Sequence, residues 1–156
     1  MRNQLLVVLG GVVLLAGCAE GQKPTPLRRS VSGRSLYDRL GGEPGIIRIV
    51  DDFVANVAAD EKIKEHHRKH FQEGDVAGLK KKLADQIGEA AGGPQKYTGR
   101  SMKEAHQGLA ITNADFDALV ADLVKAMDNN KVGPAEKKEL LDLFEKMRPD
   151  VLGKPE

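Results

Sequence analysis

The sequence predicts an all-α domain, and three observations support that prediction. After residue 34, apolar residues recur at the three- and four-residue spacing that places them on one face of a helix. No stretch alternates apolar and polar residues over the length of a strand, and β-branched residues are sparse. Glycine and proline pairs separate the periodic segments, as they do where helices end and begin. The chain holds no internal repeat, so we expect residues 35–152 to form one domain.

Residues 1–17 are expected to be a lipoprotein signal peptide. Arg2 precedes an apolar run from Leu5 to Ala16, which is shorter than the roughly 20 residues that a membrane-spanning helix needs. The run ends in the letters LAGC, which resemble a bacterial lipobox, and Cys18 is the only cysteine of the chain. We therefore predict lipidation at Cys18 and anchoring in the cell envelope. Ala19, rather than an aspartate, follows the cysteine, which by lipoprotein habit implies the outer membrane, facing the periplasm.

Residues 18–34 are expected to be a flexible tether, because they are mostly polar and include Pro24 and Pro26. Arg2 is the only charged residue before Cys18, so the rest of the chain has equal numbers of basic and acidic residues. This balance argues against a nucleic-acid partner, since phosphate binding needs a basic excess.

The first half of the domain is expected to form helices over residues 35–40, 44–57, 60–70 and 75–90. Pro44 suits a first helical turn, Asp75 suits an N-cap, and the letters GGP from Gly92 end the last of these helices. The side chains expected to face the core are Ile46, Val50, Phe53, Val54, Val57, Leu79, Leu83, Ile87 and Ala90.

The second half is expected to hold two long helices. Thr112 and Asp115 have the spacing of a capping box and predict a helix that ends near Asn129. Gly133 and Pro134 open the last helix. The side chains expected to face the core are Phe116, Leu119, Val120, Leu123, Val124, Met127, Leu140, Leu143, Phe144 and Met147.

His106 lies between these halves, and at helical spacing it shares an otherwise apolar face with Met102 and Leu109. Two interpretations follow from the residues alone. The ring is either a core histidine whose nitrogens bind backbone groups, or a ligand presented to an apolar cofactor. The domain has four phenylalanines, two tyrosines and no tryptophan, so a bound apolar group would complete a core that has few aromatic residues.

Four segments together resemble the group I truncated haemoglobins. They read SLYDRLGGEPGI, DDFVANVAAD, AAGGPQKYTGRSMKEAHQGLAIT and FDALVADLV, and the resemblance extends from about Ser35 to Val151. The segment from Gly92 to Thr112 is the most specific. The resemblance implies a truncated globin, a two-over-two helical sandwich, with haem b as cofactor and His106 as the proximal ligand of its iron. It also implies a set of pocket residues: Phe53, Val54, Phe71, Leu79, Lys82, Leu83, Gln86, Ile87, Tyr97, Thr98, Met102, His106, Phe116 and Val120.

The chain departs from the family at the distal side of the expected haem. Many group I members have a tyrosine at the position of Val54 and a glutamine at the position of Leu83, and both hydrogen-bond dioxygen. Here Gln86 and Lys82 are the nearest polar candidates. Lys82 is expected to reach a haem propionate, and a role as sixth iron ligand is the alternative.

The letters KEHHRKHFQEGD form a second departure. Counting forward from Val54 places His67 at the family's haem-packing phenylalanine, whereas counting back from His106 places Phe71 there, and we prefer Phe71 because it keeps the aromatic ring. His66 and His70 stand one turn apart, so the His66/His67/His70 cluster is a candidate metal site, with a solvated basic face as the simpler interpretation.

We expect a haem protein that binds a diatomic gas: dioxygen, nitric oxide or carbon monoxide. Oxygen transport, nitric oxide detoxification and electron transfer with a donor protein all fit the sequence. A binding protein is favoured over an enzyme, with nitric oxide dioxygenase or peroxidase-like side activity left open. The alternatives are a haem-free helical lipoprotein that acts as an interaction module, and a metal-binding protein that uses the histidine cluster.

Overall fold

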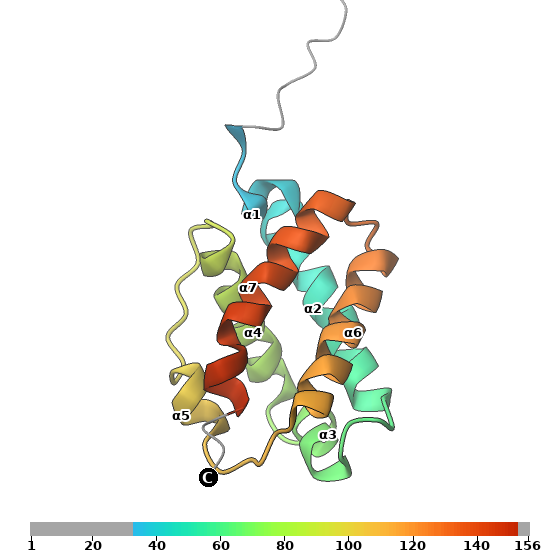
Figure 1. Cartoon of the computed structure of the whole chain (residues 1–156). Helices are drawn as coiled ribbons and strands as arrows, with labels where there is room; N and C mark the ends of the chain where they lie inside the picture. Colours follow the sequence, from blue (N-terminus) through green and yellow to red (C-terminus); the bar gives the residue numbers. More distant parts are fainter. Residues whose placement is uncertain (1–32, 153–156) are drawn as a thin grey trace, which may run out of the picture. The chain divides into compact units, whose positions relative to one another are not determined.

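The computed structural model describes residues 33–152, and this range contains helices and no strand, as the sequence predicts (Figure 1). The helices are α1 (Leu36–Arg39), α2 (Gly42–Ala59), α3 (Glu65–Gln72), α4 (Val76–Ala90), α5 (Met102–His106), α6 (Asn113–Asn129) and α7 (Pro134–Leu152). Residues 1–32 lie outside the described range, and with them the predicted signal peptide, the lipidation site at Cys18 and most of the tether.

The four long helices pack as two pairs, α2 with α4 and α6 with α7. α2 packs against both α4 and α6, and α7 packs against α6 and the short helix α5. In Figure 1, α6 and α7 lie in front of α2 and α4. The turn between α6 and α7 spans only Asn130–Gly133, which forces these two helices to run antiparallel. Helix α3 contacts α2 and α4 at one end of the domain.

The close approach of α1 to α2 requires a glycine at position 45. A Cβ atom on Gly45 would stand 1.9 Å from the carbonyl oxygen of Leu40, a distance that no side chain tolerates. Gly41 supplies the left-handed backbone (φ 91°) that turns the chain between the two helices. Helix α2 consequently begins at Gly42, two residues before the predicted start at Pro44.

The apolar core lies where α2, α6 and α7 meet. Ile46, Ile49, Val57, Leu123 and Met127 are at most 1% exposed. Burial of this apolar surface is the main force that holds the pairs together. No helix among residues 33–152 is both long and apolar enough to cross a membrane.

Two arginines make contacts that stabilise α7, one near each end of the helix. Near the start of α7, Arg39 of α1 pairs with Glu136 (2.8 Å) and Glu139. Near its end, the Arg148 guanidinium binds Asp117 of α6 (2.7 Å) and lies 4.2 Å from the centre of the Phe116 ring. These contacts fix α7 against α1 and α6, so its inward side chains are held in place.

The capping box that starts α6 forms as predicted. The Thr112 hydroxyl accepts a hydrogen bond from the Asp115 backbone N–H (3.2 Å), and the Asp115 carboxylate accepts from the Thr112 backbone N–H (2.9 Å). Burial disfavours the charged form of Asp115, but the hydrogen bonds from Thr112 and the nearby Lys64 ammonium outweigh burial and lower its pKa below 3.8.

We expect Asp115→Asn to lower the free energy of unfolding by about 1 kcal/mol at pH 7. Because the folded-state pKa of Asp115 is lowered, its contribution is complete above the unfolded value of 3.8 and is lost as the pH falls through the folded value. The difference from wild type, measured by urea unfolding, should therefore stay constant above about pH 4 and shrink as the pH falls below 3.8. Asp142→Asn is the control, because among residues 33–152 Asp142 pairs only with the exposed Lys138 one turn before it. A difference that stays constant with pH contradicts the assignment.

Candidate functional site: a cavity behind His106

A cavity of about 660 Å³ lies among the helices, and six of them contribute to its wall. Its volume falls within the range of roughly 300–1,000 Å³ that is usual for cofactor pockets. The apolar lining residues are Phe53, Ile63, Phe71, Gly74, Leu79, Leu83, Met102, Ala105, Leu109, Ile111, Phe116, Leu119, Phe144, Met147 and Val151. The polar lining residues are His67, His70, Glu73, Asp75, Lys82, Gln86, Tyr97, Arg100, His106 and Asp115.

His106 is half-buried on this wall, at the end of the five-residue helix α5. Its Nδ1 lies 2.7 Å from the backbone carbonyl oxygen of Met102. A carbonyl only accepts hydrogen bonds, so Nδ1 carries the proton and Nε2 keeps its lone pair. Such a bond orients a metal-binding imidazole and raises the basicity of its second nitrogen.

A capping box holds α5 in place. The Ser101 hydroxyl accepts from the Glu104 backbone N–H (3.3 Å), and the Glu104 carboxylate accepts from the Ser101 hydroxyl (2.7 Å) and backbone N–H (3.1 Å). These bonds lower the pKa of Glu104, with the Ser101 hydroxyl as the largest cause. A helix of five residues is unstable without such end contacts.

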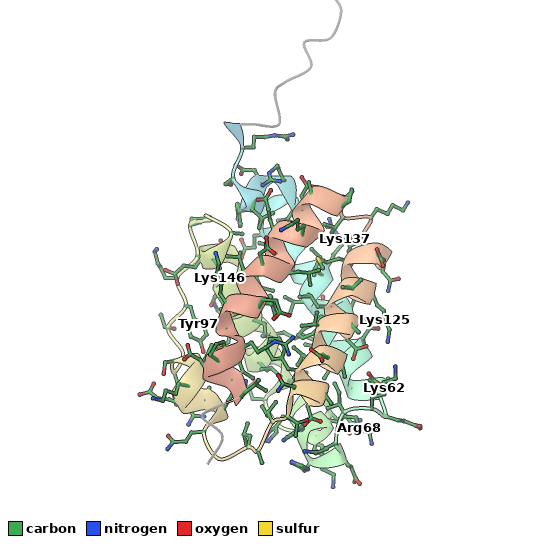
Figure 2. The ribbon with its side chains drawn as sticks, viewed as in Figure 1. Lys62, Arg68, Tyr97, Lys125, Lys137 and Lys146 are labelled. Carbon is green, nitrogen blue, oxygen red and sulfur yellow. The ribbon has the colours of Figure 1, made fainter. Side chains whose placement is uncertain are left out.

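The connection between α4 and α5 is extended and is tied back to α4. Glu89 accepts hydrogen bonds from the Tyr97 backbone N–H (2.9 Å) and from the Lys96 ammonium (3.0 Å), and in that order they lower its pKa. The Tyr97 hydroxyl donates to the Arg100 carbonyl (2.8 Å). Figure 2 shows Tyr97 on this connection. The extended backbone leaves the cavity open where a longer helix before His106 would fill it.

Gln86 does not present a free amide to the cavity. Its Nε2 lies 3.2 Å from the sulfur of Met102 and 3.1 Å from the sulfur of Met147. A thioether is a weak acceptor, but this geometry directs the amide toward α5 and α7. Lys82 is then the cationic candidate on α4, and it is exposed.

Ten of the fourteen expected pocket residues line the cavity: Phe53, Phe71, Leu79, Lys82, Leu83, Gln86, Tyr97, Met102, His106 and Phe116. The other four lie off its wall. Val54 and Ile87 are buried in the core, Thr98 is exposed on the α4–α5 connection, and Val120 lies half-buried on α6. Adjacent residues of a helix differ by about 100° in direction, so Phe53 and Val54 face different sides of α2.

His67 and Phe71 both line the cavity, so the two ways of counting through this segment name neighbouring positions on one face of α3. The Phe71 ring meets that of Phe53 edge to face, with centroids 6.5 Å apart. Within residues 33–152, no group of three histidine, cysteine or acidic side chains is placed to hold a metal ion, so the structure gives no support to the histidine-cluster alternative.

Several wall residues were missed by the sequence analysis. Ile111 and Arg100 flank the His106 segment, and their nearness in sequence was an available signal, whereas Leu109 lines the cavity as its position on the face of His106 predicts. Phe144 and Met147 were expected to face inward, and the structure gives them a place on the wall. Ile63 and Glu73 lie just outside α3 and Asp75 caps α4, where no periodic pattern reveals the direction of a side chain.

The cavity fits a haem in its chemistry as well as its size. Apolar side chains cover most of the wall, the His106 imidazole has a nitrogen without a hydrogen bond among the described residues, and two exposed cations, Lys82 and Arg100, line the cavity and carry the charge that carboxylates of a bound group require. A helical domain of two packed pairs with such a cavity is the arrangement expected of a truncated globin.

Comparisons with known proteins agree with that class. The bacterial-like globin family matches residues 35–152. The group 1 truncated haemoglobin of Tetrahymena pyriformis is 33% identical over 121 residues, covering 78% of this chain and 97% of the relative. A group 1 truncated haemoglobin of a Nostoc species is 32% identical over 120 residues, covering 77% of this chain and 98% of the relative.

Solved structures show the same similarity. The Fe(III) form of the Tetrahymena pyriformis protein superposes with a TM-score of 0.70 at 32% identity, covering 78% of this chain and all of that chain. The 2/2 haemoglobin of Synechococcus sp. PCC 7002, with covalently attached haem, gives a TM-score of 0.69 at 31% identity and the same coverage. The present chain belongs to the bacterial-like globin family and has the truncated haemoglobin fold, with haem iron as the cofactor of that family.

Proposed function

We propose that this protein binds a diatomic gas at a haem iron that His106 ligates, and that it does so in the cell envelope, anchored through a lipid on Cys18. Haem iron supplies the chemistry of reversible gas binding. Family membership supports gas binding in general; the iron ligand, the gas, the role and the location are the parts that we add.

One observation carries the assignment of His106. Its Nδ1 is occupied by the Met102 carbonyl, which leaves Nε2 as the nitrogen available to a metal on the cavity side. The alternative of a satisfied core histidine requires partners for both nitrogens, and among residues 33–152 the hydrogen bonds of His106 include only the one at Nδ1.

The remaining wall residues have two expected roles: the apolar ones exclude water, and the cationic ones bind negative charge. Phe53, Leu79 and Leu83 give the cavity an apolar side on α2 and α4. Lys82 and Arg100 are placed to pair with haem propionates, and because Lys82 is exposed we favour this role over iron ligation. An apolar wall offers little stabilisation to a gas that gains partial negative charge, so we favour reversible binding or transport over nitric oxide dioxygenation.

We expect His106→Ala to lose stable haem retention while it keeps its helical content, because the variant removes the ligand and leaves the core intact. Haem per chain and the Soret band of protein purified from a haem-supplied host are the measurements. His66→Ala is the matched control, since His66 is exposed and does not line the cavity. Equal haem content in wild type and His106→Ala would refute the ligand assignment.

Leu83→Gln is expected to slow dioxygen dissociation about three- to tenfold, because it adds a hydrogen-bond donor to the apolar side of the cavity. Carbon monoxide gains less from a donor, so its dissociation should change much less. Flash photolysis and stopped-flow measure both rates. Lys82→Met is the companion variant: if it alone speeds dioxygen loss by a similar factor, the wild-type cavity already has a donor and the apolar description is wrong.

Cys18→Ser tests the location. We expect the variant to leave the membrane fraction or to accumulate with residues 1–17 uncleaved, since a serine cannot carry the lipid. Fractionation and labelling with radioactive palmitate follow the protein. Membrane partition and palmitate incorporation equal to wild type would rule out the anchor while leaving haem binding untouched.

A further inference from the structure

The connection that follows His106 has a strained backbone, and contacts with another part of the chain stabilise it. Residues 107–112 join α5 to α6, with Gly108 at φ 79° and Ala110 at φ 49°. A left-handed backbone costs free energy at an alanine, and such a conformation persists only where surrounding contacts hold it.

Two side chains from the start of α3 hold this connection. His67 donates from Nε2 to the carbonyl oxygen of Leu109 (2.8 Å), 42 residues later in the chain. The Lys64 ammonium donates to the carbonyl oxygen of Ala110 (3.5 Å) and pairs with the Asp115 carboxylate (3.3 Å). His67 is only 7% exposed, so its hydrogen bond is sheltered from competing water.

Leu109 also contacts His106, through the peptide group on its other side. The Leu109 backbone N–H donates to the carbonyl oxygen of His106 (3.1 Å). Leu109 therefore receives a hydrogen bond from α3 at its carbonyl and donates one to His106 at its amide. The path from His67 to the backbone of His106 runs through a single residue.

We propose that His67 is a positioning residue that fixes the backbone of His106 through Leu109, and so sets the orientation of the imidazole toward the cavity; this rests on the proposed role of His106 as iron ligand. Burial alone does not require a histidine here, since Phe71, one turn further along α3, lines the same cavity with an apolar ring. What the imidazole adds to a phenyl ring is the Nε2 donor.

The decisive comparison is between His67→Phe, which keeps an aromatic ring without a donor, and His67→Gln, whose amide nitrogen reaches about as far as Nε2. His66→Phe is the control, because His66 is exposed and its ring lies beside that of His67, with centroids 3.9 Å apart and planes tilted by 59°. Haem per chain is measured first, so that failure of the proposed function shows separately from failure of this inference.

In the haem-loaded full chain, we expect His67→Phe to shift and broaden the iron–histidine stretching band in resonance Raman spectra. The Leu109 amide should exchange hydrogen about two- to tenfold faster, as expected for the loss of one neutral hydrogen bond. His67→Gln should restore both values, and His66→Phe should change neither. The exchange measurement needs no haem, and it therefore still tests the hydrogen bond from His67 to Leu109 if haem is absent.

Two results would overturn the inference. One is a His67→Phe protein that matches wild type in both readouts, and the other is a His67→Gln protein as disturbed as His67→Phe, which would make the role one of packing. If His67→Phe does not fold, nitrogen NMR of the wild-type chain decides: we expect the proton of His67 on Nε2, and a proton found on Nδ1 alone excludes the bond to Leu109.

Discussion

The hydrogen bond from His106 Nδ1 to the Met102 carbonyl is the contact on which the site depends. It fixes which nitrogen of the ring carries a proton, and it does so inside a helix of only five residues. A helix that short has almost no stability of its own, so the bond is only as rigid as the ends of α5. The Ser101–Glu104 capping box fixes one end, and the Leu109 peptide fixes the other.

The cavity and the core are two consequences of one arrangement of helices. Where α2, α6 and α7 meet, their side chains pack without room for a ligand, and Leu123 and Met127 are fully buried. Toward α5, an extended connection replaces what a full helix would occupy, and the same long helices there present Phe53, Phe116 and Phe144 to a cavity. The rigid core thus holds the wall that a cofactor would complete.

Local signals explain what could be predicted from the sequence. The caps at Thr112 and Asp75 depend on residues three positions apart, so the starts of α6 and α4 could be predicted. Which residues of a helix line the cavity depends on the rotation of that helix about its axis. The periodicity of apolar residues predicts this rotation only to within one residue position. Phe53 lines the cavity and Val54 does not for that reason. The contact of His67 could not be predicted from the sequence, because its partner carbonyl lies 42 residues away.

We expect gas affinity in this protein to depend more on the residues around His106 than on those at the opposite side of the cavity. Leu79 and Leu83 offer no donor to a gas, and the Gln86 amide is directed at two thioethers. If His106 ligates the iron as proposed, the alignment of its imidazole is a further influence on gas affinity. That alignment is set by the Met102 carbonyl within α5 and, from outside it, by the contacts of Lys64 and His67 with residues 109 and 110. The histidine-rich segment that departs most from the family pattern therefore contacts the segment after His106, through hydrogen bonds from Lys64 and His67 to backbone carbonyls.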